Sequence, residues 1–243
     1  MHHNKVLVVL TNTSTFPHER EREEPSFNAT ETRTGFNIKD VAYIYEILSK
    51  KNCSLIFTSP HGGECSIDPR SLETSKNDEV VKRFLNDHEA MHRIKNTRKL
   101  HDVADMQFIG AVFPGGPGTL FDLPYERTAT DIVSDIYPRR YSFIAAIGHG
   151  LAALINVKLE KSGEHWLKGK RVTCQTVEEE KALKIDHRLP FNLEEKLKQL
   201  GAKVEKADKF SPKVVEDERL ITAQNSDSVR EWVETIARHC NPN

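Results

Sequence analysis

Short apolar runs alternate along the chain with longer segments in which apolar residues recur every three or four positions. The short runs predict β-strands at residues 6–10, 54–58, 109–113, 142–147, 171–174 and 220–222. The longer segments predict helices, among them residues 40–50, 194–200 and 228–239. Alternation of this kind predicts an α/β fold in which a mostly parallel sheet is covered by helices on both faces.

The chain is expected to fold as a single domain over residues 1–243, because neither an internal repeat nor a linker-like composition interrupts the pattern. Folds of this class place their functional sites at the carboxyl ends of the strands. Candidate chemistry is therefore sought where a predicted strand ends.

The turn after the strand at residues 142–147 has the outline of a nucleophile elbow, since a buried helix is predicted to begin directly after Gly148, His149 and Gly150. An elbow holds a serine or cysteine in a strained backbone conformation that costs roughly 1–3 kcal/mol. Gly148 carries no nucleophile, and a glycine relieves that strain. The pattern therefore indicates an enzyme scaffold that lacks its reactive atom.

A glycine-rich loop follows the strand at residues 109–113. Gly115 and Gly116 are candidates for oxyanion-hole donors, because consecutive glycines let backbone N–H groups approach a ligand closely. The alternative is that these glycines only form a tight turn before a helix.

Several blocks of sequence, in order along the chain, resemble the DJ-1/PfpI superfamily, whose fold is that of the class I glutamine amidotransferases. The blocks lie at residues 34–40, 59–63, 68–71, 113–119 and 145–154. Three more, at residues 168–173, 178–180 and 220–225, resemble the stress-chaperone and glyoxalase III branch of that superfamily.

The resemblance implies a flavodoxin-like, doubly wound α/β fold and, in active members, a cysteine at the elbow. That cysteine is followed by a histidine and is hydrogen-bonded by a glutamate from the first helix. Such members convert methylglyoxal and water to lactate without a cofactor, and some act as chaperones or deglycases. Carried over to this chain, the cysteine position is Gly148, the histidine is His149 and the glutamate position is Asp40. The resemblance also implies a homodimer.

Two of these three positions differ from the active pattern, which predicts a non-catalytic protein. Gly148 has no thiol for covalent catalysis, and Asp40 is expected to end roughly 1.5 Å short of any hydrogen-bond partner. Leu151 and Pro117 also depart from the pattern, since they stand where proline and histidine are usual. What is expected to remain is a pocket for a small carbonyl or carboxylate compound, or a chaperone or regulatory role.

The alternative is a glyoxalase III-type lyase or a deglycase that works without the elbow cysteine. His149 would then activate water as a general base, although a structural role for this histidine is favoured. Cys174 would instead supply a relocated thiol, although an unreactive buried cysteine is commoner. The carboxylates of residues 178–180 are expected to lie on a solvated loop.

Composition narrows the class of partner. Lys and Arg total 35 and Asp and Glu total 36, so there is no electrostatic reason to expect nucleic acid or a membrane surface. The four cysteines are too few and too widely spaced for a disulfide framework, so reduced thiols and a cytoplasmic location are expected. The first apolar run, five residues long, is too short for a membrane span.

Three further segments are weighed on their charge and spacing. Residues 18–24 are expected to form a solvated loop or short helix, and residues 78–103 one or two exposed helices. His88, Glu89 and His92 match the H-E-x-x-H pattern of zinc proteases. A third ligand is missing at Arg98, so no metal and no cofactor are expected.

Overall fold

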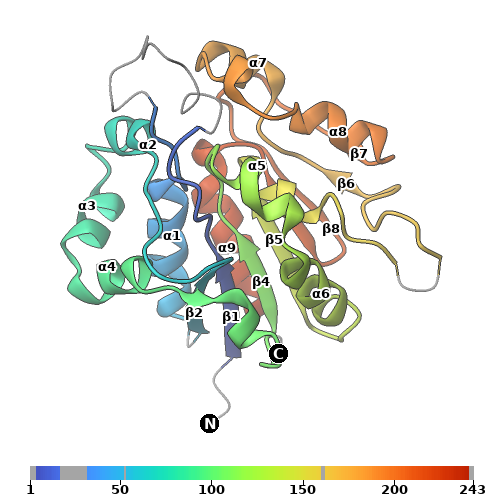
Figure 1. Cartoon of the computed structure of the whole chain (residues 1–243), viewed down its shortest axis with the longest axis horizontal. Helices are drawn as coiled ribbons and strands as arrows, with labels where there is room; N and C mark the ends of the chain where they lie inside the picture. The colour runs from blue at the N-terminus through green and yellow to red at the C-terminus, as the bar shows by residue number, and fades with distance from the viewer. Residues whose placement is uncertain (1–3, 17–31, 52, 160–161, 241–243) are drawn as a thin grey trace.

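The computed structural model of the chain describes residues 4–16, 32–51, 53–159 and 162–240. Its centre is a sheet in which all neighbouring strands are parallel except β8 and β9 (Figure 1). From edge to edge, the strands are β3 (Arg98–Lys99), β2 (Cys53–Ser59), β1 (Asn4–Val9), β4 (Gly110–Phe113), β5 (Phe143–Ile147), β9 (Leu220–Ala223) and β8 (Val214–Asp217). The predicted flavodoxin-like α/β fold is confirmed.

The central strands are continuously apolar because both faces of the sheet are covered. In β1, Val6 and Val8 point into one buried cluster, whereas Leu7 and Val9 point into the other. This alternation is the consequence of the two-residue repeat of a strand.

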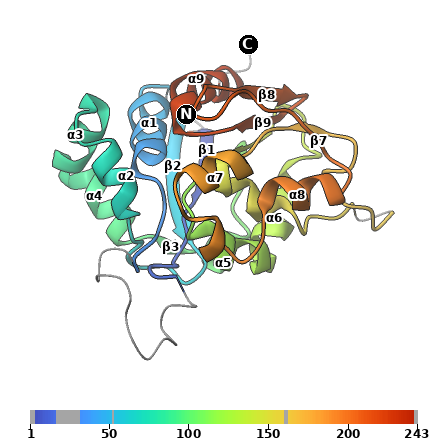
Figure 2. The same ribbon diagram turned by 90° about the horizontal axis from the view of Figure 1, so that it is seen from above.

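Helices pack on both faces, as Figure 2 shows from above. One face is covered by α1 (Ile38–Ser49), α3 (Glu79–Asn86) and α9 (Val229–Cys240). The other is covered by α5 (Thr119–Asp122), α6 (Arg127–Ile136) and the 3-10 helix η4 (Gly148–Leu154). The remaining elements are α2 (Pro69–Thr74), α4 (His88–Lys95), η2 (Leu100–Val103), η3 (Leu123–Tyr125), β6 (Arg171–Val172), α7 (Val177–Ala182), η5 (Asp186–Arg188), α8 (Leu193–Gln199), β7 (Lys203–Val204) and η6 (Ser226–Ser228).

One predicted strand does not join the main sheet. Residues 171–174 form only the short strand β6, which pairs with β7 in a separate two-stranded sheet. The cause lies in Thr173, whose amide donates to the side-chain hydroxyl of Thr222 in β9 and not to a strand carbonyl. The chain therefore passes beside the main sheet and continues to α7.

The two charged segments have different outcomes. Residues 78–103 contain α3 and α4, the exposed helices that the sequence predicts, followed by β3 and η2. Residues 18–24 lie outside the described residues. The H-E-x-x-H pattern falls on α4 with His88, Glu89 and His92 all exposed, and no group of three or more metal-binding side chains occurs within the described ranges. The pattern therefore lies on an exposed helix face without a third ligand beside it among the described residues.

Across the part of the chain that the structure describes, no helix has the length and apolar character needed to cross a bilayer.

Candidate active site

The elbow predicted from the sequence is present where β5 ends. Gly148 follows the last residue of this strand and begins η4 with φ at +55°. This is the left-handed region, which L side chains adopt only with strain. The backbone therefore has the conformation in which an elbow would display a nucleophile, with a glycine in that place.

A cavity of about 110 Å³ opens beside Gly148 and brings together five of the six predicted site residues. These are Gly148, His149, Gly115, Gly116 and Asp40. They come from the ends of β4 and β5 and from the first turn of α1, which meet at the carboxyl edge of the sheet. The place of the site is the one that strand ends predict in an open α/β sheet.

His149 is held by a buried carboxylate that the sequence analysis did not assign to the site. Its Nε2 lies 3.0 Å from Oε1 of Glu180, and both side chains are almost fully buried. Because a carboxylate only accepts hydrogen bonds, the pairing places the proton on Nε2 and leaves the lone pair on Nδ1. Nδ1 has no hydrogen-bond partner among the described residues, and His149 lines the cavity, so the Nδ1 lone pair is free to accept a proton.

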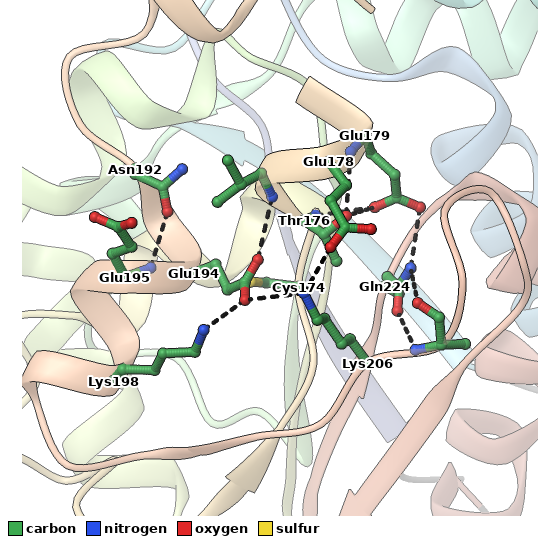
Figure 3. A network of polar contacts seen from close by, with 12 residues as sticks. Cys174, Thr176, Glu178, Glu179, Asn192, Glu194, Glu195, Lys198, Lys206 and Gln224 are labelled. Atoms are coloured by element: carbon green, nitrogen blue, oxygen red, sulfur yellow. Dashed lines mark hydrogen bonds and ion pairs between the residues drawn. The ribbon is translucent and has the colours of Figure 1, made fainter. Parts of the chain in front are cut away.

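The expectation of a solvated loop at residues 178–180 is wrong, because these residues belong to α7 and only Glu178 is exposed. Thr176 and Glu179 form a reciprocal capping box that begins the helix. Glu179 also accepts from the side-chain amide of Gln224 at 3.0 Å (Figure 3). It accepts from the side-chain amide of Asn225 at 2.7 Å as well. The T-x-x-E spacing at residues 176–179 was the signal that could have predicted this helix.

Glu180 is itself oriented from α8. The Asn192 amide donates to Glu180 Oε2 over 3.2 Å, while its oxygen caps α8 by accepting from the Glu195 amide. Each oxygen of Glu180 therefore has one partner, and the His149 pair has a fixed orientation.

Asp40 reaches two partners, contrary to the expectation that its shorter side chain would reach none. Its Oδ2 accepts from the Gly115 amide at 3.0 Å and its Oδ1 from the Ser226 hydroxyl at 2.8 Å. Burial raises the pKa of Asp40 from 3.8 to about 6, against the opposing effect of these hydrogen bonds. Asp40 can therefore carry a proton near neutral pH.

The same contact alters the predicted oxyanion hole. Because Gly115 donates to Asp40, its amide is occupied in this structure. Gly116, at φ +118°, has no acceptor for its amide among the described residues. Gly116 is therefore the backbone donor that remains available to a ligand.

Cys174 does not line the cavity, so its prediction as a relocated nucleophile is wrong. Its thiol donates to the backbone oxygen of Gln175 and lies in the apolar core. Burial, followed by the nearby carboxylates, raises the pKa of Cys174 well above its usual value. The next residue, Gln175, faces the cavity in its place.

A left-handed turn directly after a central strand, with a buried histidine–carboxylate pair beside it, defines an α/β protein with an elbow-type site at the carboxyl edge of its sheet. Comparison with known proteins narrows this class. The model of the DJ-1/PfpI family matches residues 35–239, so the chain belongs to that family. This confirms the resemblance seen in the sequence.

Individual relatives point to the glyoxalase III branch. Glyoxalase 3 of Candida albicans is 25% identical over 224 residues, which cover 89% of this chain and 94% of that protein. A glutathione-independent glyoxalase of Saccharomyces cerevisiae is 26% identical over 211 residues, covering 82% and 86%. The X-ray structure of Rapid Encystment Protein 24 kDa of Francisella tularensis has a TM-score of 0.87 and 31% identity, covering 98% of this chain and 100% of that one. The homodimer, the chaperone role and the cytoplasmic location stay predictions.

Proposed function

We propose that this protein converts small 2-oxoaldehydes and water to 2-hydroxy acids without a cysteine nucleophile. The observation that carries the proposal is the buried pair of His149 and Glu180, of which His149 lines the cavity beside Gly148. The names of the curated relatives, which are glyoxalases, support the same class of reaction.

The reaction balances without a thiol. Water adds to the aldehyde carbon, C1, and gives a diol that has the same atoms as the product. His149 Nδ1 takes the proton from C1, the C1–H electron pair forms a double bond to C2, and the C2 oxygen gains a proton from Asp40. Return of the first proton to C2, with loss of one C1 hydroxyl proton back to Asp40, then leaves a hydroxyl on C2 and a carboxylic acid at C1 and restores both residues. Glu180 stabilises the imidazolium that forms in between.

The test is the consumption of methylglyoxal with formation of lactate by the purified chain. His149→Gln is expected to lower kcat by roughly 100-fold or more, because a positioned base contributes about that much. His101→Gln, which changes an exposed histidine outside the cavity, is the matched control and should leave the rate unchanged. Treatment of the folded chain with iodoacetamide should also leave the rate unchanged, because all four cysteines are buried. Lactate formation no faster than in buffer would contradict the proposal.

The absent side chain at Gly148 favours a second candidate, a pocket that binds a small carbonyl or carboxylate compound without converting it. It predicts heat of binding for methylglyoxal or lactate in calorimetry and no lactate formation by the natural chain. A Gly148→Cys variant that gains turnover would support this candidate, because the frame would then lack only its thiol. If neither compound gives a heat of binding, this candidate also fails.

A further inference from the structure

The missing side chain at Gly148 leaves a defined space in the cavity. A Cβ placed on this residue would have only two neighbours within 4 Å, Gln175 Oε1 at 3.5 Å and the backbone oxygen of Gln224 at 3.7 Å. Both distances are ordinary van der Waals contacts. The space beyond that Cβ position therefore has hydrogen-bond acceptors on its wall.

The side chain of Gln175 is half-buried and forms no hydrogen bond with any residue that the structure describes. Its backbone is held by its neighbour, because Thr176 caps α7 through the reciprocal bonds with Glu179. An amide on a fixed backbone that lines a cavity without a protein partner has its hydrogen-bonding capacity available to a ligand.

These acceptors suit one form of an aldehyde better than the other. A free carbonyl offers only lone pairs, so it cannot donate to the backbone oxygen of Gln224 or to the Gln175 oxygen in the orientation that the structure has. The hydrated form, a geminal diol, offers two O–H donors on one carbon. In a protein with an elbow cysteine the second substituent on that carbon would be sulfur, and here the oxygen of water takes its place.

We infer that the space at Gly148 is a binding site for one hydroxyl of a hydrated aldehyde, and that Gln175 is the positioning residue that accepts from it. The inference rests on the proposed function and names the form of the substrate: the geminal diol of a small aldehyde, not the free carbonyl compound. With that hydroxyl held by Gln175, the C1–H bond is left for His149 Nδ1. The diol is already at the composition of the product, so no further reactant is required.

The test compares two fluorinated ligands that differ by one hydroxyl group. Trifluoroacetaldehyde hydrate is a stable geminal diol that has no C2 carbonyl and cannot isomerise, whereas trifluoroethanol has one hydroxyl on the same carbon. Fluorine NMR titration of the natural chain is expected to give roughly tenfold tighter binding of the diol, the amount expected for one additional net hydrogen bond.

Two variants test whether the preference for the diol arises from Gln175 and the space at Gly148. Gln175→Leu should remove the roughly tenfold preference and leave trifluoroethanol binding unchanged, and Gly148→Ala should weaken diol binding because a methyl group enters the space. Gln107→Leu, at an exposed glutamine, is the matched control and should keep the preference. Thermal melting of each variant verifies that it is folded. Equal affinity of the natural chain for both ligands, or a preference that survives in Gln175→Leu, would overturn the inference.

The outcome is separable from that of the proposed function. Selective diol binding with no lactate formation from methylglyoxal would contradict the proposed function and support this site. Lactate formation without selective binding of the diol would support the proposed function and contradict this site. A KM for methylglyoxal that rises in Gln175→Leu while kcat holds would support a binding role for Gln175, and an unchanged KM would count against it.

Discussion

Replacing Asp40 with asparagine is expected to stabilise the folded protein near neutral pH, although Asp40 lies in the candidate active site. Burial raises the pKa of this carboxyl from 3.8 to about 6. A difference of about 2.2 units means that the ionised form is disfavoured in the fold by about 3 kcal/mol at 1.36 kcal/mol per unit. Asparagine has no charge to bury, and its amide can accept from Gly115 and donate to the Ser226 oxygen in place of the carboxylate bonds.

The sign of the pH effect follows from the direction of the shift. A group with a raised pKa in the fold contributes stability that is complete below its unfolded value, 3.8, and is lost as the pH rises through about 6. Between pH 7.5 and pH 4.5 the natural chain should therefore gain about 2 kcal/mol in unfolding free energy relative to Asp40→Asn. Burial also raises the pKa of Asp122 to about 6, but this group is common to both proteins and cancels in the difference.

Urea denaturation of both proteins at pH 7.5 and pH 4.5 measures this difference. Asp131→Asn is the matched control, because its side chain on α6 is 68% exposed and should change the unfolding free energy by less than about 0.5 kcal/mol. The reasoning would be refuted if the difference between the natural chain and Asp40→Asn were the same at both pH values. It would also fail if the variant were less stable than the natural chain at pH 7.5.

Three further outcomes are expected. Gly148→Ala should lower the unfolding free energy by about 1–2 kcal/mol in thermal melts, because alanine is strained in a left-handed backbone. Gly163→Ala, at φ +68° with open space around it, is the control and should lower the unfolding free energy by the same amount. A much larger loss at position 148 would mean that the space beside Gly148 is not open. Glu179→Gln should lower the unfolding free energy measured in urea by about 3 kcal/mol, because both oxygens of the Glu179 carboxylate accept hydrogen bonds and an amide nitrogen would replace one of them. Glu178→Gln, at an exposed side chain, is the control and should leave the unfolding free energy almost unchanged. Cys174 should resist iodoacetamide in the folded chain and react in urea, as read by mass spectrometry, and modification of the folded chain would contradict its buried position.

The parts of the fold that the sequence predicts are those whose residues are buried on both sides. β1, β2, β4, β5 and β9 are mostly apolar, and their predicted bounds differ from the observed bounds by at most two residues. β3 and β8 were missed because they lie at the two edges of the sheet, where half of the contacts are with solvent and the apolar signal is weak. The strand predicted at residues 171–174 was wrong because apolar character alone does not say which sheet a segment joins.

The sequence predicts those residues of the candidate site that come directly after a central strand. Gly115, Gly116, Gly148 and His149 each come directly after a central strand, so their meeting at one edge follows from the topology. Gln175 was missed because it comes from a segment outside the main sheet, where the direction of a side chain is not set by the strand repeat.

The acid partner of His149 was missed for a different reason. A run of three glutamates is buried only where other residues donate hydrogen bonds to its carboxylates. Here those donors come from other segments of the chain. Asn225 lies 46 residues beyond Glu179, and Asn192 lies 12 residues beyond Glu180. A local pattern contains no information on such partners.

The frame of the candidate site is held by contacts that do not involve position 148. Asp40 is fixed by Gly115 and Ser226, and Glu180 by Asn192 from α8. The left-handed backbone at Gly148 is without strain for a glycine, so nothing drives it to relax when no side chain is present. A chain with this frame can therefore lack a thiol and keep the geometry around its place, which is the condition that both a thiol-free reaction and rescue by Gly148→Cys require.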